Sequence, residues 1–199
     1  MAFSDFGFPQ VRERLGLCIE DADLFKDTPP FPVREEIAAF VRDGTALAMA
    51  NATEKAKSEF IIAPVLLELR RSSRARFSLF SGVDWEVDVY LGLSGYCDFI
   101  LGRGSTQHIL QAPFLAIVEA KRDLIQTGLG PCITAMVAAR MSNEKAGLPP
   151  RPVHGVVSTG AAWKFLELRG AVVKIDIPEY LIDNLPKIMG ILRSIVEAE

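Results

Sequence analysis

The sequence predicts an α/β protein whose core is a mixed β-sheet flanked by α-helices. Helical spacing of apolar residues occurs near the start and the end of the chain, and strand-like apolar runs lie between. One short helical segment, residues 132–141, separates two groups of these runs, as a crossover connection does. At 199 residues the chain is long enough for one domain with a full core.

The first segment of the chain is predicted to lie outside this domain. Residues 1–31 contain scattered prolines and many acids with no sustained period, so we expect an irregular arm with a short helix near 11–17. Residues 32–199 are then predicted to form the single domain.

Two helices are predicted to follow the arm. Residues 33–49 carry apolar side chains in helical spacing. A second helix should begin at Asn51 or Thr53, both good N-caps, and should run to about Arg71. Pro64 removes one backbone hydrogen bond there, which predicts a kink or a late helix start.

The rest of the chain is predicted to alternate between strands and helices. Strand patterns occur at 77–80, 85–89, 91–101, 114–121, 154–159, 164–168 and 171–177. The first two form either a strand pair or one bent strand. The crossover helix should begin with Pro131 in its first turn, and residues 179–197 should form a closing helix.

Three ionisable residues interrupt the apolar strands. Asp98 lies within Y-C-D-F-I-L, while Glu119 and Lys121 end the run F-L-A-I-V-E-A-K. Side chains alternate along a strand, so Glu119 and Lys121 share one face and Ala120 points away. Charges in an apolar setting are costly unless they are paired or bound to a metal, which indicates a site at this strand end.

A divalent cation would explain the two carboxylates. Successive strands tend to be neighbours, so Asp98 and Glu119 are expected to lie close together and to repel. Hard oxygen ligands favour Mg²⁺ or Mn²⁺, and Lys121 would then stand beside the metal. An internal ion pair of Lys121 with either carboxylate, serving only the fold, is the alternative interpretation.

A third acid is expected from the helix that precedes the strands. Glu54 and Glu59 both stand before its apolar part. On a regular helical wheel Glu59 shares a face with Ile62, Ala63 and Leu66, while Glu54 points away, so Glu59 is the preferred site residue.

Four segments together resemble the PD-(D/E)XK nuclease superfamily. They are T-E-K-A-K-S-E-F-I-I-A-P-V-L, G-Y-C-D-F-I-L, A-I-V-E-A-K and T-G-A-A-W-K-F-L, spread over residues 53–168. They look most like its short stand-alone bacterial members, frequent in cyanobacteria and mostly of undefined function. The resemblance implies a restriction-endonuclease-like sheet and Mg²⁺-dependent (or Mn²⁺-dependent) hydrolysis of phosphodiester bonds in nucleic acid, with DNA as the expected substrate.

The resemblance also assigns roles to the residues that match. Asp98 and Glu119 would bind the metal, the carbonyl of Ala120 would assist, Lys121 would act on the attacking water, and Glu59 would be the helix acid.

Two positions depart from the superfamily pattern. Cys97 stands where a proline often precedes the Asp, and Gln126 is the nearest match to a glutamine that several branches carry in the following helix.

The charge balance leaves a second function open. With 22 basic and 25 acidic residues the net charge is −3, so nucleic-acid binding would need a local patch. The most basic stretch, at 70–76, is either a solvated helix end or a phosphate-facing surface. The alternative function is a catalytically silent module that binds nucleic acid or protein.

Localisation and assembly follow from weaker signals. The start of the chain lacks the basic and apolar regions of a signal peptide, and no apolar run has the roughly 18 residues of a membrane span, so we expect a cytoplasmic protein without a membrane partner. A nuclease that cuts both strands of a duplex needs two sites, which suggests a homodimer.

Overall fold

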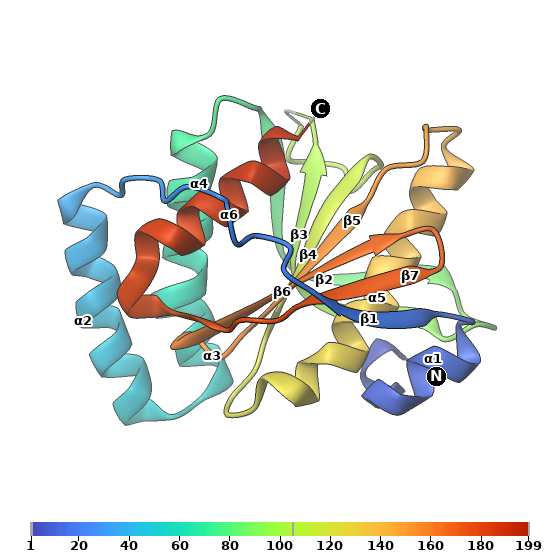
Figure 1. Cartoon of the computed structure of the whole chain (residues 1–199), viewed down its shortest axis with the longest axis horizontal. Coiled ribbons are helices and arrows are strands. Elements are labelled where there is room, and N and C mark those ends of the chain that lie inside the picture. Colours follow the sequence, from blue (N-terminus) through green and yellow to red (C-terminus); the bar gives the residue numbers. More distant parts are fainter. Residues whose placement is uncertain (1, 105, 199) are drawn as a thin grey trace.

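The computed structural model describes residues 2–104 and 106–198, and it has an eight-stranded sheet between two layers of helices (Figure 1). The strands are β1 (Cys18–Ala22), β2 (Phe77–Asp88), β3 (Leu93–Arg103), β4 (Phe114–Ala120), β5 (Val153–Ser158), β6 (Ala162–Arg169), β7 (Val172–Asp176) and β8 (Tyr180–Leu181). The helices are α1 (Phe8–Arg14), α2 (Glu35–Asn51), α3 (Glu54–Lys57), α4 (Ala63–Ser72), α5 (Ile125–Lys145) and α6 (Leu185–Glu197).

The sheet is mixed, as the sequence predicts. Its order is β1-β7-β6-β5-β4-β3-β2, with β8 added beside β6. The pairs β4–β5 and β1–β7 are parallel, and the other neighbours are antiparallel. Helix α5 is the crossover between β4 and β5, because parallel neighbours cannot be joined by a tight turn. The α/β class and the mixed sheet are thereby confirmed.

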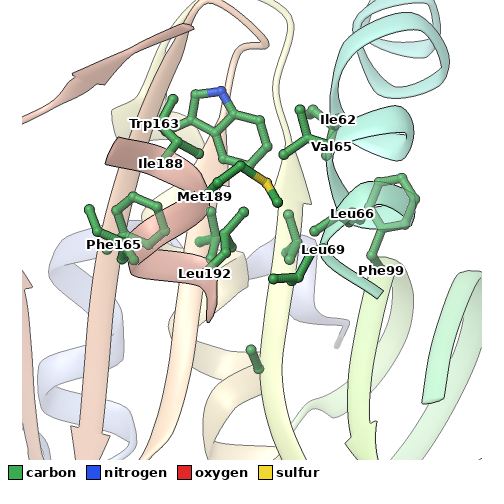
Figure 2. Packing of buried hydrophobic residues seen from close by; sticks show 14 of the residues in the cluster. Ile62, Val65, Leu66, Leu69, Phe99, Trp163, Phe165, Ile188, Met189 and Leu192 are labelled. Atoms are coloured by element: carbon green, nitrogen blue, oxygen red, sulfur yellow. The ribbon is translucent and has the colours of Figure 1, made fainter. Parts of the chain in front are cut away.

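Each face of the sheet has its own apolar core. Helices α4 and α6 cover one face, where Leu66 and Leu69 meet Trp163, Phe165 and Leu192, and α2 packs against the outer side of α4 (Figures 1 and 2). Helices α1 and α5 cover the other face. Burial on both faces explains why the central strands are almost continuously apolar. Among the described residues, no helix is long and apolar enough to cross a bilayer.

The short helix predicted near 11–17 is present as α1, three residues earlier, but the prediction of an otherwise irregular arm outside the domain is wrong. Phe3 and Phe6 are buried, helix α1 follows them, and β1 joins the sheet edge beside β7. This pairing links Cys18 to Val172, more than 150 residues away in the chain. A period search along a short stretch cannot detect such a partner, because burial of β1 comes from a distant strand.

The second predicted helix contains a π turn. The Thr53 side chain accepts a hydrogen bond from the amide of Ala56, which confirms the predicted cap. Pro64 has no amide hydrogen to offer the carbonyl of Phe60, and residues 58–62 just before it are wound as a π-helix in which Ala63 donates to the carbonyl of Ser58. The distortion predicted at Pro64 is therefore one turn of wider winding between α3 and α4.

Other boundaries also differ from the sequence-based expectation, among them the closing helix, which begins at Leu185 after the short strand β8. The patterns at 77–80 and 85–89 belong to one strand, β2, in which Gly82 has a φ of 67°. Helix α5 begins at Ile125 and contains Pro131 in its interior. Its early glycines suggest a loop in the sequence, but they allow close packing: a Cβ at Gly130 would overlap the carbonyl of Phe6.

Close packing of α2 on the π turn predicts the effect of one substitution. Gly44 of α2 lies against the Phe60 carbonyl, and a Cβ there would overlap the oxygen. Gly44→Ala should therefore lower the free energy of unfolding by about 1–3 kcal/mol, although alanine normally favours a helix over glycine by about 1 kcal/mol. Denaturant unfolding measures the change.

The matched control is Ala46→Gly at an exposed position of the same helix. It should cost about 1 kcal/mol, the difference in helix propensity. A Gly44→Ala protein more stable than wild type would show that α2 does not approach the π turn this closely.

Candidate active site

The ammonium group of Lys121 is the centre of the site. Lys121 follows β4, and its amide donates to the carbonyl of Ser158 at 2.8 Å, which extends the pairing with β5 by one residue. Its Nζ donates to Glu119 Oε1 at 2.7 Å and to the Ala120 carbonyl oxygen at 2.8 Å. One positive charge is thus held by a carboxylate and a backbone oxygen at the end of the strand.

Asp98 reaches the same strand end from β3. Its Oδ2 accepts a hydrogen bond from the amide of Ala120 at 2.8 Å. Residues 97–98 of β3 lie beyond Phe99, the last residue of β3 that pairs with β4 at this end, so the Asp98 side chain, rather than the backbone of β3, satisfies this amide. The structure therefore brings Asp98, Glu119 and Lys121 together around one peptide unit.

The helix acid beside this group is Glu54, not Glu59. Glu54 Oε1 lies 3.9 Å from Lys121 Nζ. The side chain of Glu59 is 53% exposed and pairs with Lys55 at 3.3 Å, so the predicted placement of Glu59 on the buried face is wrong. The π turn explains the error, because it rotates the residues after it relative to those of a regular 3.6-residue helix.

A buried lysine that sequence reasoning missed also joins α3 to the site. Lys57 is 7% exposed, its Nζ donates to the carbonyl of Arg122, and Asp123 Oδ1 lies 4.0 Å away. It stands three residues after Glu54, on the same side of the helix. Lys57 stands four residues before the buried Ile61, and this helical spacing indicates in the sequence that Lys57 faces the interior. Through Lys57, helix α3 therefore binds the loop after β4 at Arg122 and at Asp123.

Helix α5 supports Lys121 from the other side. At Gly128, a Cβ would lie 2.9 Å from Cγ of Lys121 and 2.5 Å from Cγ1 of Val157. The aliphatic stem of Lys121 therefore runs across the glycine, and the ammonium is directed back over Glu119.

Burial and mutual repulsion shift the charges of the site. Burial raises the pKa of Glu119 to about 7; the charge of Lys121 opposes this shift and that of Asp98 adds to it. Burial also raises the pKa of Asp98, against the hydrogen bond from Ala120. For Lys121, burial lowers the pKa, but Glu119, Glu54 and Asp98 together outweigh it, so its pKa is raised and the ammonium stays charged.

A cleft opens beside these residues. It has a volume of about 520 Å³ and is lined by Glu54, Lys55, Ser58, Glu59, Ser81, Gly82, Tyr96 and Asp98. A larger cavity of about 590 Å³ lies near the start of β4, against Phe114 and His154, and does not include the carboxylates. Of these two cavities, the smaller one is the candidate site, because Asp98 and Glu54 line it.

The donor set suits a hard divalent cation. Asp98, Glu119 and the Ala120 carbonyl supply only oxygen, the ligand type that Mg²⁺ and Mn²⁺ prefer. The Lys121 ammonium already binds two of these groups, which shows that their oxygens converge on a cation. Within the described part of the chain, no three Asp, Glu, His or Cys side chains form a ready-made metal cluster, so a metal would rely on the carbonyl or on water as a further ligand.

The basic stretch at 70–76 lies away from the site. Arg71 is near the end of α4, while Glu54 begins α3, and the helical segment between them is roughly 25 Å long at 1.5 Å per residue. Arg70 is fixed by a hydrogen bond from its Nε to the carbonyl of Phe77. These arginines do not line the cleft beside Asp98.

Comparison with known proteins does not assign this chain to a family. No family model, no curated protein sequence and no solved structure matches it. The resemblance to the PD-(D/E)XK superfamily therefore rests on the sequence motifs, and function has to be argued from the chemistry of the site.

The raised pKa of Glu119 predicts how stability depends on pH. A carboxyl group whose pKa rises on folding, here from 4.5 to about 7, favours the folded state most below pH 4.5, and this contribution is lost as the pH rises through 7. In metal-free buffer the free energy of unfolding should therefore fall by something on the order of 3 kcal/mol across this range. Glu119→Gln should remove most of the fall.

Denaturant unfolding at a series of pH values measures these slopes. Glu59→Gln, a change of the same kind at an exposed position, should keep the wild-type slope. If Glu119→Gln also keeps it, Glu119 does not titrate in this range.

Proposed function

We propose that this protein is a Mg²⁺- or Mn²⁺-dependent phosphodiesterase that hydrolyses nucleic acid, with DNA as the expected substrate, on a restriction-endonuclease-like core. The observation that carries the proposal is the convergence of Asp98, Glu119, the Ala120 carbonyl and the Lys121 ammonium at the end of β4. Sequence motifs that resemble the PD-(D/E)XK superfamily fall at these same residues.

Asp98, Glu119 and the carbonyl of Ala120 would hold the metal. When bound, the cation supplies charge neutralisation at the phosphate and lowers the pKa of a bound water. The carboxylates repel one another and lie close to buried surface, which makes the site favourable for a divalent cation. Binding would also compete with Lys121 for Glu119 and Ala120.

Lys121 would act as a fixed positive charge. Because its pKa is raised, Nζ stays protonated at neutral pH and has no lone pair with which to accept a proton from water. Its N–H groups can instead donate to a phosphate oxygen on which negative charge grows in the transition state. Glu119 contributes most to keeping this ammonium charged, and Glu54 adds to the effect from a distance of 3.9 Å.

A second candidate is a binding module without turnover. It is favoured by one observation: Lys121 is already satisfied by Glu119 and Ala120, as an internal ion pair would be. In that case the group stabilises the end of β4, and the cleft binds nucleic acid or protein without chemistry. Removal of Lys121 separates the two candidates.

Lys121→Ala should abolish cleavage and leave the fold largely intact. Loss of a preorganised charge at the phosphate typically lowers the rate by roughly 100-fold or more. Glu119, whose pKa is already raised by burial, can take up a proton when its partner is removed, so the cost to folding is limited. The measurements are Mn²⁺-dependent nicking of plasmid and single-stranded DNA, and thermal melting of the metal-free protein.

Lys26→Ala, at an exposed position of the N-terminal segment, is the control and should behave as wild type. The binding-module hypothesis makes the opposite prediction for activity: the wild type nicks no substrate, so Lys121→Ala has no cleavage to lose. The stability of Lys121→Ala is not the discriminating result, because Glu119 can be protonated under either hypothesis.

Metal binding should depend on Asp98 and Glu54 but not on Glu59. Mn²⁺ should raise the melting temperature of the wild type, since a ligand that binds only the folded state stabilises it. Asp98→Asn should eliminate this rise, and Glu54→Gln should reduce it by removing a negative charge near the site.

Glu59→Gln serves as the matched control for Glu54→Gln, because its side chain is exposed and paired with Lys55. Calorimetric titration with Mn²⁺ gives the affinities. A stronger effect of Glu59 than of Glu54 would reverse the assignment of the helix acid, and no Mn²⁺ binding by wild type at millimolar concentration would remove the metal site.

A further inference from the structure

An exposed tyrosine lies beside the candidate metal ligands. Tyr96 stands two residues before Asp98 on β3, and both line the 520 Å³ cleft. Tyr96 is a large hydrophobic residue, yet it is 64% exposed. Large aromatic rings on a surface next to a reactive centre are often there to contact a ligand.

Gly82 of β2 determines how the ring lies. With a φ of 67°, Gly82 adopts a backbone conformation that other residues rarely take. A Cβ there would lie 2.5 Å from the hydroxyl oxygen of Tyr96 and 3.4 Å from its Cζ. The tip of the tyrosine therefore lies over the bare glycine backbone of β2, in a position that a side chain at residue 82 would block, and the residue stays exposed beside the cleft.

The size and charge of the cleft limit what can enter. Its volume falls within the roughly 300–1,000 Å³ of small-molecule sites, which suits a single nucleotide and not a segment of duplex. The cleft is lined by three acidic side chains, Glu54, Glu59 and Asp98, and by one basic side chain, Lys55. This acidic wall repels a phosphate backbone that runs through the cleft, so a ligand has to gain its affinity from a contact other than charge.

We propose, on the basis of the nuclease function above, that Tyr96 is a stacking platform for an unpaired nucleobase and that the substrate is single-stranded nucleic acid. Every base has a π-face, so a stacked base binds without regard to sequence. Base stacking on Tyr96 would place the adjoining phosphate beside Asp98, where a metal held by Asp98 and Glu119 would supply positive charge.

Polar groups around the ring fit the rest of a nucleotide. Ser58 and Ser81 line the cleft with hydroxyl groups that can donate to a phosphate or sugar oxygen. The pair of Lys55 with Glu59 is exposed on both sides and contributes little to stability, so Lys55 is able to turn toward a phosphate. These contacts complement a stacked base without requiring a second strand.

The test is binding of a fluorescent single-stranded oligonucleotide, followed by anisotropy with Mn²⁺ in the Lys121→Ala background to suppress cleavage. Tyr96→Ala should weaken binding about 5- to 100-fold, the range expected for the loss of one stacked base. Tyr96→Leu, which keeps an apolar side chain without a ring, should lose a similar amount of affinity. Tyr96→Phe should bind the oligonucleotide with an affinity within about twofold of that of the protein with Tyr96 intact.

Tyr90→Ala is the matched control. Tyr90 is fully exposed between β2 and β3 and does not line the cleft, so its removal should not change binding. A duplex of the same length should bind more weakly than the single strand. Melting curves of each variant confirm that it is folded.

The outcomes separate this inference from the nuclease proposal. The stacking platform is overturned if Tyr96→Ala binds the single strand as tightly as the protein with Tyr96 intact. It is also overturned if a duplex binds as tightly as the single strand, even where the wild type cleaves DNA. A wild type that cleaves no substrate overturns the nuclease proposal, whereas a ring-dependent preference for the single strand still supports the platform.

Discussion

The charge of Lys121 at the end of β4 is the constraint on which the site depends. It is mostly removed from water and has to be compensated by oxygens fixed by the fold, namely Glu119 and the Ala120 carbonyl. Three elements hold it there: β5 pairs with its backbone, Gly128 of α5 gives room to its stem, and Glu54 of α3 faces its ammonium. A shift of any one of them moves the positive charge away from the carboxylates.

The N-terminal segment contributes to this arrangement from a distance. The chain at Phe6 crosses α5 at Gly130, two residues after the glycine that faces Lys121. Together with β1 on the sheet edge, this contact fixes α5 against the β4–β5 pair. Residues that look like a detachable arm in the sequence therefore form part of the frame that positions the site, and for this reason the segment cannot be separated from the domain.

The parts of this structure that sequence could predict are those with a local cause. Asp98, Glu119 and Lys121 were visible because each interrupts an apolar run, and Thr53 was visible as a cap. The choice between Glu54 and Glu59 failed because one π turn changes the helical phase. The pairing of β1 was missed because its partner strand lies at the other end of the chain.

The distribution of charge also limits how nucleic acid can approach. Arginines lie at the far end of α4, while carboxylates line the cleft near α3, so a long polyanion gains nothing by running through the cleft. On the proposed function, the one point where a phosphate would be tolerated lies beside Asp98 and Glu119, where burial and mutual repulsion favour a divalent cation. In the proposed mechanism a bound metal would attract one phosphate and the tyrosine ring would attract one base, while the carboxylates would reject the rest of a duplex. An acidic protein would in this way select a short unpaired segment.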